Sequence, residues 1–407
     1  MRVRYNSQIL RVQALAGLVA LAGFSAQAQE LAATGPDGEL RLMAGDLAVL
    51  GSEELRTDLP CQVEKLDPQL EFDLNFQAGF NVKIPLSALE GPGNALRILF
   101  RIQSTDVPGD PVYFRQRFSV PPIDEGAEGS TTLPGRYRLG PGRYKLDWLM
   151  RDRAERVCAD SWEIRAETLE GFEKLAATAT AHSISTAGNV LYFEEPPVRR
   201  ARGKLKHVKV LVNFTPLQPD RVNLLPYDKL NVLSMLRGIA REPTFGTFSL
   251  VVYNMHEERV VFEEVEVPRL DFPALGEAIE DIRGGEVAFD QLEDKEPGRA
   301  FIRQLFADHV AKTEDAPDVI LFLGPKVVMK KDPDGPFLAR STMTSKPIFY
   351  FVYNRNPRAY PWKDGVSIGL KGYEPTESQV VTPRDFGRAM KELLEFLAGP
   401  PAAPSDS

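Results

Sequence analysis

Two apolar runs late in the chain limit most strongly what it can fold into: DVILFLG at 318–324 and PIFYFVY at 347–353. Strands that are apolar at nearly every position must be buried on both faces, as they are in parallel sheets covered by helices. Further strands are expected at 208–214 and 248–253, and the alternating run ERVVFEEVEV at 258–267 should be an antiparallel edge strand. Helices should begin at Pro226, after Asp271, near Phe301 and after Thr382. Residues 204–399 therefore predict a Rossmann-like α/β domain with a mainly parallel sheet.

The region from residue 61 to residue 166 has a different periodicity. Short runs such as LRILFRI at 96–102 alternate along their length, and turn sequences such as EGPGN and LGPGR separate them. Period-two alternation buries one face of each strand, which is typical of antiparallel sheets packed as a sandwich. The stretch GPGRYKLDWLMRDRAERV at 140–157 resembles a hairpin of bacterial immunoglobulin-like domains. We expect an all-β immunoglobulin-like sandwich here, so the chain is multidomain.

Cys61 and Cys158 are the only cysteines, and they flank this strand-rich region. In an oxidising compartment such a pair forms a structural disulfide, which is the pairing we expect. The alternative is two buried free thiols. No histidine lies near either cysteine in the sequence, which argues against a metal-binding or catalytic role.

The first 28 residues have the organisation of a secretory signal peptide. Arg2, Arg4 and Arg11 precede or flank an apolar segment, and Ala26-Gln27-Ala28 supplies small residues for cleavage. The alternative is an uncleaved membrane anchor, but the apolar segment is short for a span of about 20 residues. Cleavage would shift the net charge from −8 to −11. The leader indicates export to the periplasm or extracellular space of a bacterium, with no transmembrane segment after signal cleavage.

The remaining boundaries follow from composition. Residues 29–60 form an N-terminal extension, residues 167–203 form a connector, and residues 400–407 form a disordered tail. The basic stretch RRARGKLKHVK at 199–209 could bind an anionic polymer or lipid, or could be a solvated connector. We favour the connector because one short basic run on an acidic protein is not a nucleic-acid footprint. No nucleic-acid partner is expected.

The order of elements in residues 204–399 resembles a von Willebrand factor A (VWA) domain of exported bacterial proteins. The resemblance rests on the strand KVLVNF with its following elbow, the hairpin FSLVVYNMHEERVVFEEV, the helix FPALGEAIEDIRGG and the strand DVILFLG. In that family three loops at one edge of the sheet build a metal-ion-dependent adhesion site, in which oxygen ligands hold Mg²⁺.

The residues at the matching positions indicate that this metal site is degenerate. The first loop of the family, D-x-S-x-S, corresponds to Asn213, Thr215 and Leu217. The threonine of the second loop corresponds to Glu286, and the aspartate of the third corresponds to Gly324. A carboxylate has become an amide, and two further oxygen ligands are gone. We therefore expect neither a metal nor another cofactor.

Other chemical motifs are incomplete. GVSIG at 365–369 matches the hydrolase elbow G-x-S-x-G, but no histidine follows it, so a loop serine is expected. KKDPDGP at 330–336 lacks most of the ligands of a calcium loop. The four histidines, His182, His207, His256 and His309, show no metal-binding spacing.

Two classes of function remain. The sequence favours an exported, non-enzymatic protein that binds a protein partner. The alternative is an exported hydrolase or transferase whose catalytic residues converge only in space. Ligands of open α/β sheets bind beyond the carboxyl ends of the strands, and the basic loop 324–346 follows one of them. The predicted contact residues are Phe214, Lys326, Lys330, Lys331, Phe337 and Arg340. The alternative without a binding role is that this loop is a solvated insertion.

Overall fold

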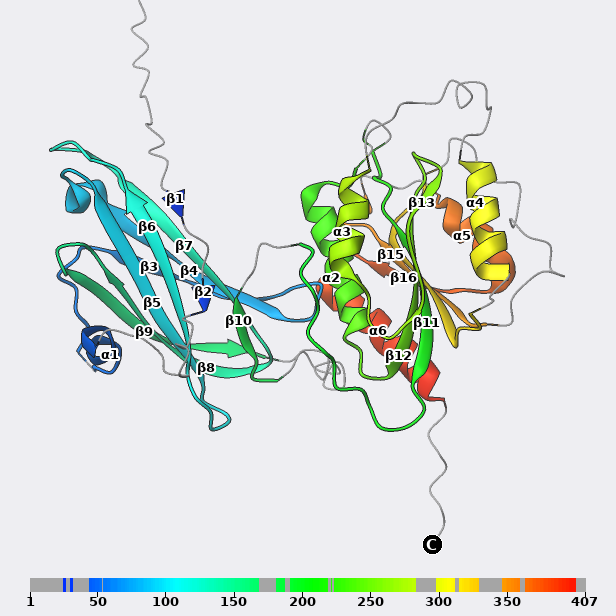
Figure 1. Ribbon diagram of the computed structural model, residues 1–407, viewed down its shortest axis with the longest axis horizontal. Coiled ribbons are helices and arrows are strands. Elements are labelled where there is room, and N and C mark those ends of the chain that lie inside the picture. The colour runs from blue at the N-terminus through cyan, green and yellow to red at the C-terminus, as the bar shows by residue number, and fades with distance from the viewer. Residues whose placement is uncertain are drawn as a thin grey trace, which may run out of the picture.

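The computed structural model describes residues 25–26, 30–31, 44–52, 54–167, 181–186, 191–218, 221, 223–282, 298–311, 315–328, 346–358 and 363–399. They form a β-rich part and a part with strands and helices, which lie side by side (Figure 1). Among these residues no helix combines the length and the apolar character needed to cross a membrane.

The β-rich part contains two antiparallel sheets. In the first, the order is β1 (Ser25–Ala26), β6 (Val112–Val120), β5 (Asn94–Ser104), β8 (Gly142–Arg151) and β9 (Val157–Ala166), and β2 (Glu30–Leu31) also pairs with β6. In the second, it is β10 (Ile184–Thr186), β7 (Ser130–Leu139), β4 (Phe76–Pro85) and β3 (Gln62–Leu70). The short helices α1 (Ala44–Leu50) and η1 (Leu86–Leu89) complete it.

The two sheets share one hydrophobic core. Phe80 of β4 contacts Phe100 of β5 and Trp148 of β8 edge to face, with ring centroids 5.4 and 5.6 Å apart. Such aromatic pairs add to the stabilisation from burial. The expected alternation therefore buries one face of each sheet, and the sandwich architecture follows from it.

A disulfide joins Cys61 to Cys158, as expected from the sequence. Their Cα atoms are 6.3 Å apart, within the range of a native bridge. Cys61 immediately precedes β3 and Cys158 lies in β9, so the bond ties an edge strand of one sheet to an edge strand of the other.

The other part is a six-stranded sheet. Its order is β13 (Arg259–Val267), β12 (Phe245–Asn254), β11 (Lys206–Asn213), β14 (Val319–Pro325), β15 (Ile348–Tyr353) and β16 (Thr376–Val380). All neighbours are parallel except β12 and β13. The mainly parallel sheet and its antiparallel edge strand are thus confirmed, whereas β16 was not predicted.

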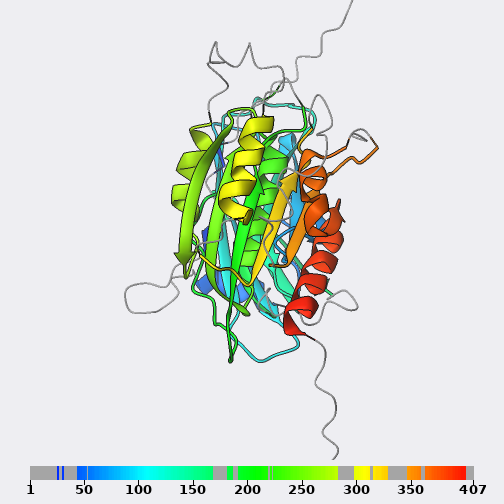
Figure 2. The same ribbon diagram turned by 90° about the vertical axis from the view of Figure 1, so that its right-hand side faces the viewer.

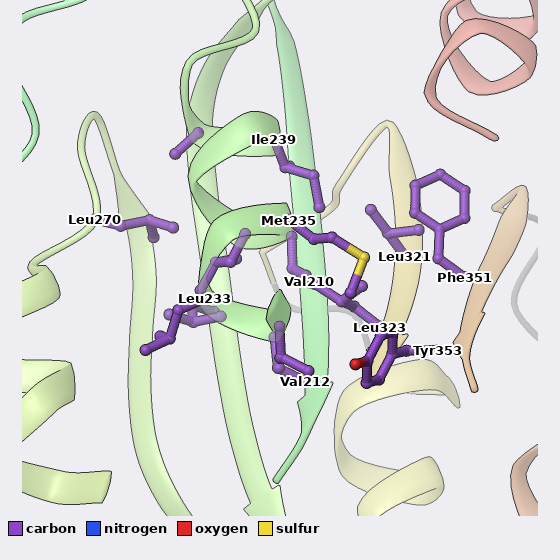
Figure 3. Close-up of a cluster of buried hydrophobic side chains, with 14 of the residues drawn as sticks. Val210, Val212, Leu233, Met235, Ile239, Leu270, Leu321, Leu323, Phe351 and Tyr353 are labelled. Atoms are coloured by element: carbon purple, nitrogen blue, oxygen red, sulfur yellow. The ribbon is translucent and has the colours of Figure 1, made fainter. Parts of the chain in front are cut away.

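Helices cover both faces of this sheet (Figures 1 and 2). On one face the core contains residues of α2 (Pro226–Ala240), α3 (Phe272–Glu280) and α6 (Pro383–Ala398). On the other it contains residues of α4 (Arg299–Phe306), the following turn η4 (Ala307–Ala311) and α5 (Gly365–Leu370), which η6 (Lys371–Tyr373) extends. In Figure 3, Met235 of α2 lies against Leu323 and Tyr353 of the sheet.

The predicted helix starts are confirmed where caps were expected. The Asp271 side chain accepts a hydrogen bond from the Ala274 amide at the start of α3. Thr382 and Asp385 form a reciprocal capping box at the start of α6. These local signals fix where each helix enters the domain.

The predicted boundaries divide the elements as follows. The expected leader, 1–28, contains β1, and the extension 29–60 contains β2 and α1. The connector 167–203 contributes β10, which pairs with β7 and so belongs to the sandwich. Arg200 of its basic stretch donates to the carbonyl oxygens of Ala240 and Glu242, a structural use of that charge. The tail 400–407 lies outside the described residues.

Candidate functional site

The elbow after β11 is held by hydrogen bonds within the protein. The Asn213 side-chain nitrogen Nδ2 donates to the Pro325 carbonyl oxygen at 2.8 Å, and the side-chain oxygen Oδ1 accepts from the Thr215 backbone N–H at 2.9 Å. Asn213 is 1% exposed. An aspartate could not make the first bond, because a carboxylate has no N–H to donate. The side-chain amide therefore joins the ends of β11 and β14.

The second elbow oxygen is also used. The Thr215 hydroxyl accepts from the Met255 backbone N–H at 2.7 Å, and the Asn254 side-chain amide donates to the Phe214 carbonyl oxygen at 3.3 Å. These bonds tie the elbow to the end of β12. The ends of three neighbouring strands are thus held together by side-chain amide and hydroxyl groups.

Gly324, the position matching the third metal-binding loop, serves a backbone purpose. Its φ is +132°, and a Cβ atom there would come within 2.5 Å of the Asn213 carbonyl oxygen. Only glycine permits so close an approach between β14 and the elbow. An aspartate at this position is therefore incompatible with the observed packing.

Phe214 does not have the role predicted for it. Its side chain is 1% exposed and belongs to the same core cluster as Val208, Val210 and Val212. The strand's alternation continues into the elbow and turns the ring inward, so Phe214 is not a partner contact in this conformation. Lys326 follows β14 directly and is half-buried. The other predicted positions, Glu286, Lys330, Lys331, Phe337 and Arg340, lie outside the described residues.

A cavity of about 340 Å³ opens beside the elbow, at the carboxyl ends of the central strands. Its lining is Leu217, Gln218, Leu224, Leu225, Asp228, Pro325, Tyr353, Arg355 and Asn356. From β11 the sheet continues to β12 on one side and to β14 on the other. The cavity thus lies at the topological switch point, where ligands of such sheets bind. Of the predicted site residues, the described part of the chain brings only Leu217 into this lining.

Tyr353 organises one wall of the cavity. Its hydroxyl donates to the Asp228 carboxylate at 2.8 Å and accepts from the Asn231 amide at 2.8 Å. Burial raises the pKa of Tyr353 well above its usual value, and the hydrogen bond to Asp228 acts in the same direction. The hydroxyl therefore stays protonated and fixes the Asp228 side chain at the start of α2.

One lining residue of the cavity, Arg355, also contacts an exposed aromatic ring, and we call this pair the rim. The Arg355 guanidinium lies 4.4 Å from the ring centroid of Tyr227, whose side chain is 51% exposed. Asp228 and Arg355 line the same cavity, but they form no ion pair with each other or with any other residue described. Neither Tyr227 nor Arg355 was predicted as a contact residue, although Tyr227 directly follows the predicted helix start at Pro226 and Arg355 follows a predicted strand.

The segments that follow β14 and β15 in the sequence are basic. The segment 354–363 contains Arg355, Arg358 and Lys363 and no acidic residue. The segment 326–346 contains five basic residues and two acidic ones. The chain as a whole has a net charge of −8, so these two segments differ in charge from the sequence average. Of their basic residues in the described part of the chain, Arg355 lines the cavity, where its positive charge would attract a negatively charged partner.

One cluster has the residue types of a catalytic triad but a different geometry. The Ser249 hydroxyl lies 3.0 Å from the His207 Nε2 atom, and the Asp315 carboxylate lies 3.9 Å from that same nitrogen. In a working triad the carboxylate holds the other ring nitrogen. Ser249 is 1% exposed, and Asp315 is also paired with Lys209 at 3.1 Å. This cluster is a polar network at the start of β11, with its serine buried.

The GVSIG serine is also placed differently from the prediction. Ser367 lies in α5, not in a loop, and its hydroxyl is 3.0 Å from both an Asp364 and a Glu377 carboxylate oxygen. Burial raises the pKa of both carboxyl groups. Both neighbours are carboxyl groups, whereas the serine of a hydrolase elbow is paired with a histidine. Within the described residues no group of three or more histidine, cysteine or acidic side chains is arranged to hold a metal.

Comparisons with known proteins add no family. No protein-family model matches the chain, and no curated protein matches it. A lipoprotein from Bacteroides thetaiotaomicron matches 30% of this chain and 90% of its own, with 9% identity and a TM-score of 0.14. A conjugate transposon protein from Bacteroides vulgatus matches 30% and 95%, with 14% identity and a TM-score of 0.13. A β-glucuronidase from Bacteroides uniformis matches 79% and 39%, with 8% identity and a TM-score of 0.16. Similarities this small carry no argument about fold or function.

Proposed function

We propose that the protein is an exported, non-enzymatic binding protein. Its sandwich is of the immunoglobulin-like kind, and its α/β domain is related to VWA domains that have lost their metal site. It binds a protein partner through the face at the carboxyl ends of the parallel strands. The signal-like leader and the Cys61–Cys158 disulfide support export.

The observation that carries this proposal is the cavity at the switch point, with Tyr227 and Arg355 at its rim. Tyrosine and arginine dominate the energetics of protein interfaces because they combine a large contact area with a polar group. Apolar lining from Leu217, Leu224 and Pro325 supplies a surface to desolvate. The elbow uses its own polar atoms for hydrogen bonds, so the face can act without a bridging ion.

The charge of this face favours an acidic partner. Arg355 lines the cavity, and the segments that follow β14 and β15 in the sequence are basic although the protein as a whole is acidic. Complementary charge steers association and excludes basic competitors. We therefore propose an acidic protein surface in the cell envelope as the partner.

The alternative function, a hydrolase or transferase, has less support. The Ser249–His207–Asp315 cluster and Ser367 are two places among the described residues where catalytic residue types meet. The first has its serine buried, and in the second the serine hydroxyl contacts carboxylates. Neither arrangement has the accessible serine paired with a histidine that a hydrolase triad requires.

The test is capture of a partner from envelope extract by the mature protein. Replacing residues 329–341 with a Gly-Ser bridge should abolish capture and leave the melting temperature nearly unchanged. The matched control replaces a stretch of the 168–180 segment, far in sequence from the cavity, with a Gly-Ser bridge of the same length. Undiminished capture by the first variant would move the binding site elsewhere, most directly to the sandwich.

A further inference from the structure

The tip of the β3–β4 hairpin connects two strands of the sandwich, but its side chains pack into the core of the α/β domain. Phe72 and Leu74 are 5% and 7% exposed, and both lie in the core cluster formed by α2, α3, α6 and the six-stranded sheet. Removing two such apolar side chains from water stabilises the arrangement in which the hairpin tip packs on the α/β domain. Figure 1 shows this hairpin extending from the sandwich toward α2. The α/β domain therefore lacks part of its core without the sandwich.

The tip is rigid and anchored. The Glu71 and Leu74 amides donate across the turn to the Asn75 and Glu71 carbonyls at 2.8 and 2.9 Å. Between them, the buried Asp73 pairs with Arg138 of β7 at 2.8 Å and with Arg241 at the end of α2 at 3.2 Å. One carboxylate thus links the two domains, and it fixes where Phe72 enters the second one.

Phe72 contacts the residue that organises the cavity wall. Its ring lies edge to face against Tyr353, with centroids 5.8 Å apart at an interplanar angle of 85°. The hydroxyl of the same tyrosine holds Asp228 and Asn231 at the cavity. A continuous chain of contacts therefore runs from the sandwich hairpin through one aromatic side chain to the cavity lining.

We infer that Phe72 is a positioning residue for the binding face: the sandwich fixes Tyr353, and through it Asp228, at the cavity of the α/β domain. The functional meaning rests on the proposed partner site, but the coupling itself does not. The two domains form one binding unit, in which the sandwich hairpin sets the conformation of a surface on the other domain. Losing the Phe72 ring leaves Tyr353 free to tilt away from Asp228.

Amide hydrogen exchange of the full mature protein tests this without any partner. In Phe72→Ala, exchange should rise about tenfold in 224–231 and 353–356, as expected for losing an aromatic pair. The matched control is Leu74→Ala, which removes a side chain from the same tip and the same core cluster but has no ring against Tyr353. Its exchange at 353–356 should stay near the wild-type value. Tyr353→Phe, which keeps the ring and loses the hydroxyl, should raise exchange in 224–231.

The outcomes separate the coupling from the proposed function. Unchanged exchange at 353–356 in Phe72→Ala, or an equal rise in Leu74→Ala, would overturn the inference. Should Phe72→Ala not fold, Phe72→Leu keeps most of the volume without the ring and must show the same pattern at smaller amplitude. Failure of the wild-type protein to capture any partner would count against the proposed function and leave these exchange results standing.

Discussion

Asp73→Asn is the substitution whose cost follows most directly from the structure. Asn keeps the shape of the side chain but removes the charge that pairs with Arg138 and Arg241. Glu195 also binds Arg241, at 2.6 Å, whereas Asp73 is the one ion-pair partner of Arg138 among the described residues. The guanidinium of Arg138 is largely buried and would be left without a counter-charge. Breaking a buried pair in this way costs about 3–5 kcal/mol.

The pH dependence gives this prediction a second signature. Burial by itself raises the pKa of Asp73, but Arg138 and Arg241, with hydrogen bonds from Asn75, outweigh it and the pKa is lowered. A carboxyl with a lowered pKa in the folded state stabilises the protein above its unfolded pKa of about 3.9. That contribution is lost as the pH falls through the folded value. The difference between wild type and Asp73→Asn should therefore be full at pH 7 and shrink below about pH 4.

The assay is urea unfolding of the mature protein at a series of pH values. Asp58→Asn is the matched control, because Asp58 pairs with Arg56 at 2.8 Å on the exposed surface, and an asparagine can still accept the hydrogen bond from the Val157 backbone amide. Its effect should be far smaller, since exposed pairs contribute little. An Asp73→Asn variant as stable as wild type at pH 7, or a difference that does not change with pH, would refute the reasoning that this carboxylate holds the two domains together.

Two further predictions concern the disulfide and the elbow. Non-reducing mass spectrometry of exported protein should find Cys61 linked to Cys158. The double variant Cys61→Ala/Cys158→Ala should lower the free energy of unfolding by up to about 4.7 kcal/mol, because the disulfide closes a loop of 97 residues. Two free thiols in native protein would contradict this. Titration with Mg²⁺, Mn²⁺ or Ca²⁺ should leave the melting temperature unchanged beyond a general salt effect, because a bound metal would stabilise the folded state by mass action. A saturable rise that Asn213→Ala removes would show that the elbow still coordinates a metal.

The interior of the fold could be predicted from the sequence because burial leaves a strong pattern. The runs at 318–324 and 347–353 are apolar throughout, and they became the central strands β14 and β15. Edge strands are less buried, so their apolar sequence pattern is weaker. β16, with the sequence TESQV, has little apolar content, and most of β3 is exposed or half-exposed, so neither was predicted.

The tip of the hairpin has a local pattern that tertiary packing overrides. Phe72, Leu74 and Phe76 alternate like a strand, but only Phe76 begins one. The first two bury their side chains in the other domain, which no local pattern reveals. Phe214 was predicted as a partner contact, although it continues the alternation of Val208, Val210 and Val212, and it lies buried with them in one core cluster.

The cavity lies at the edge of the sheet where the sequence led us to expect a partner site, but most of its lining residues were not among those predicted. The switch point at the ends of the parallel strands follows from strand order, and the elbow marks it in the sequence. The rim residues Tyr227 and Arg355 come from segments far apart in the chain, and only the fold brings them together. Likewise, the reason for Gly324 lies in a contact with Asn213 across two strands.

Capture of the envelope partner by Arg355→Glu is the measurement that tests the proposed binding face. We expect this variant to capture at least about tenfold less partner than wild type, because an arginine at an interface centre contributes about 2 kcal/mol or more to the binding free energy. Arg303→Glu makes the same charge change on the exposed side of α4, away from the cavity, and should capture normally. The deficit of Arg355→Glu should narrow as salt screens the acidic partner. Equal capture by wild type, Arg355→Glu and Arg303→Glu would contradict the assignment of the binding face.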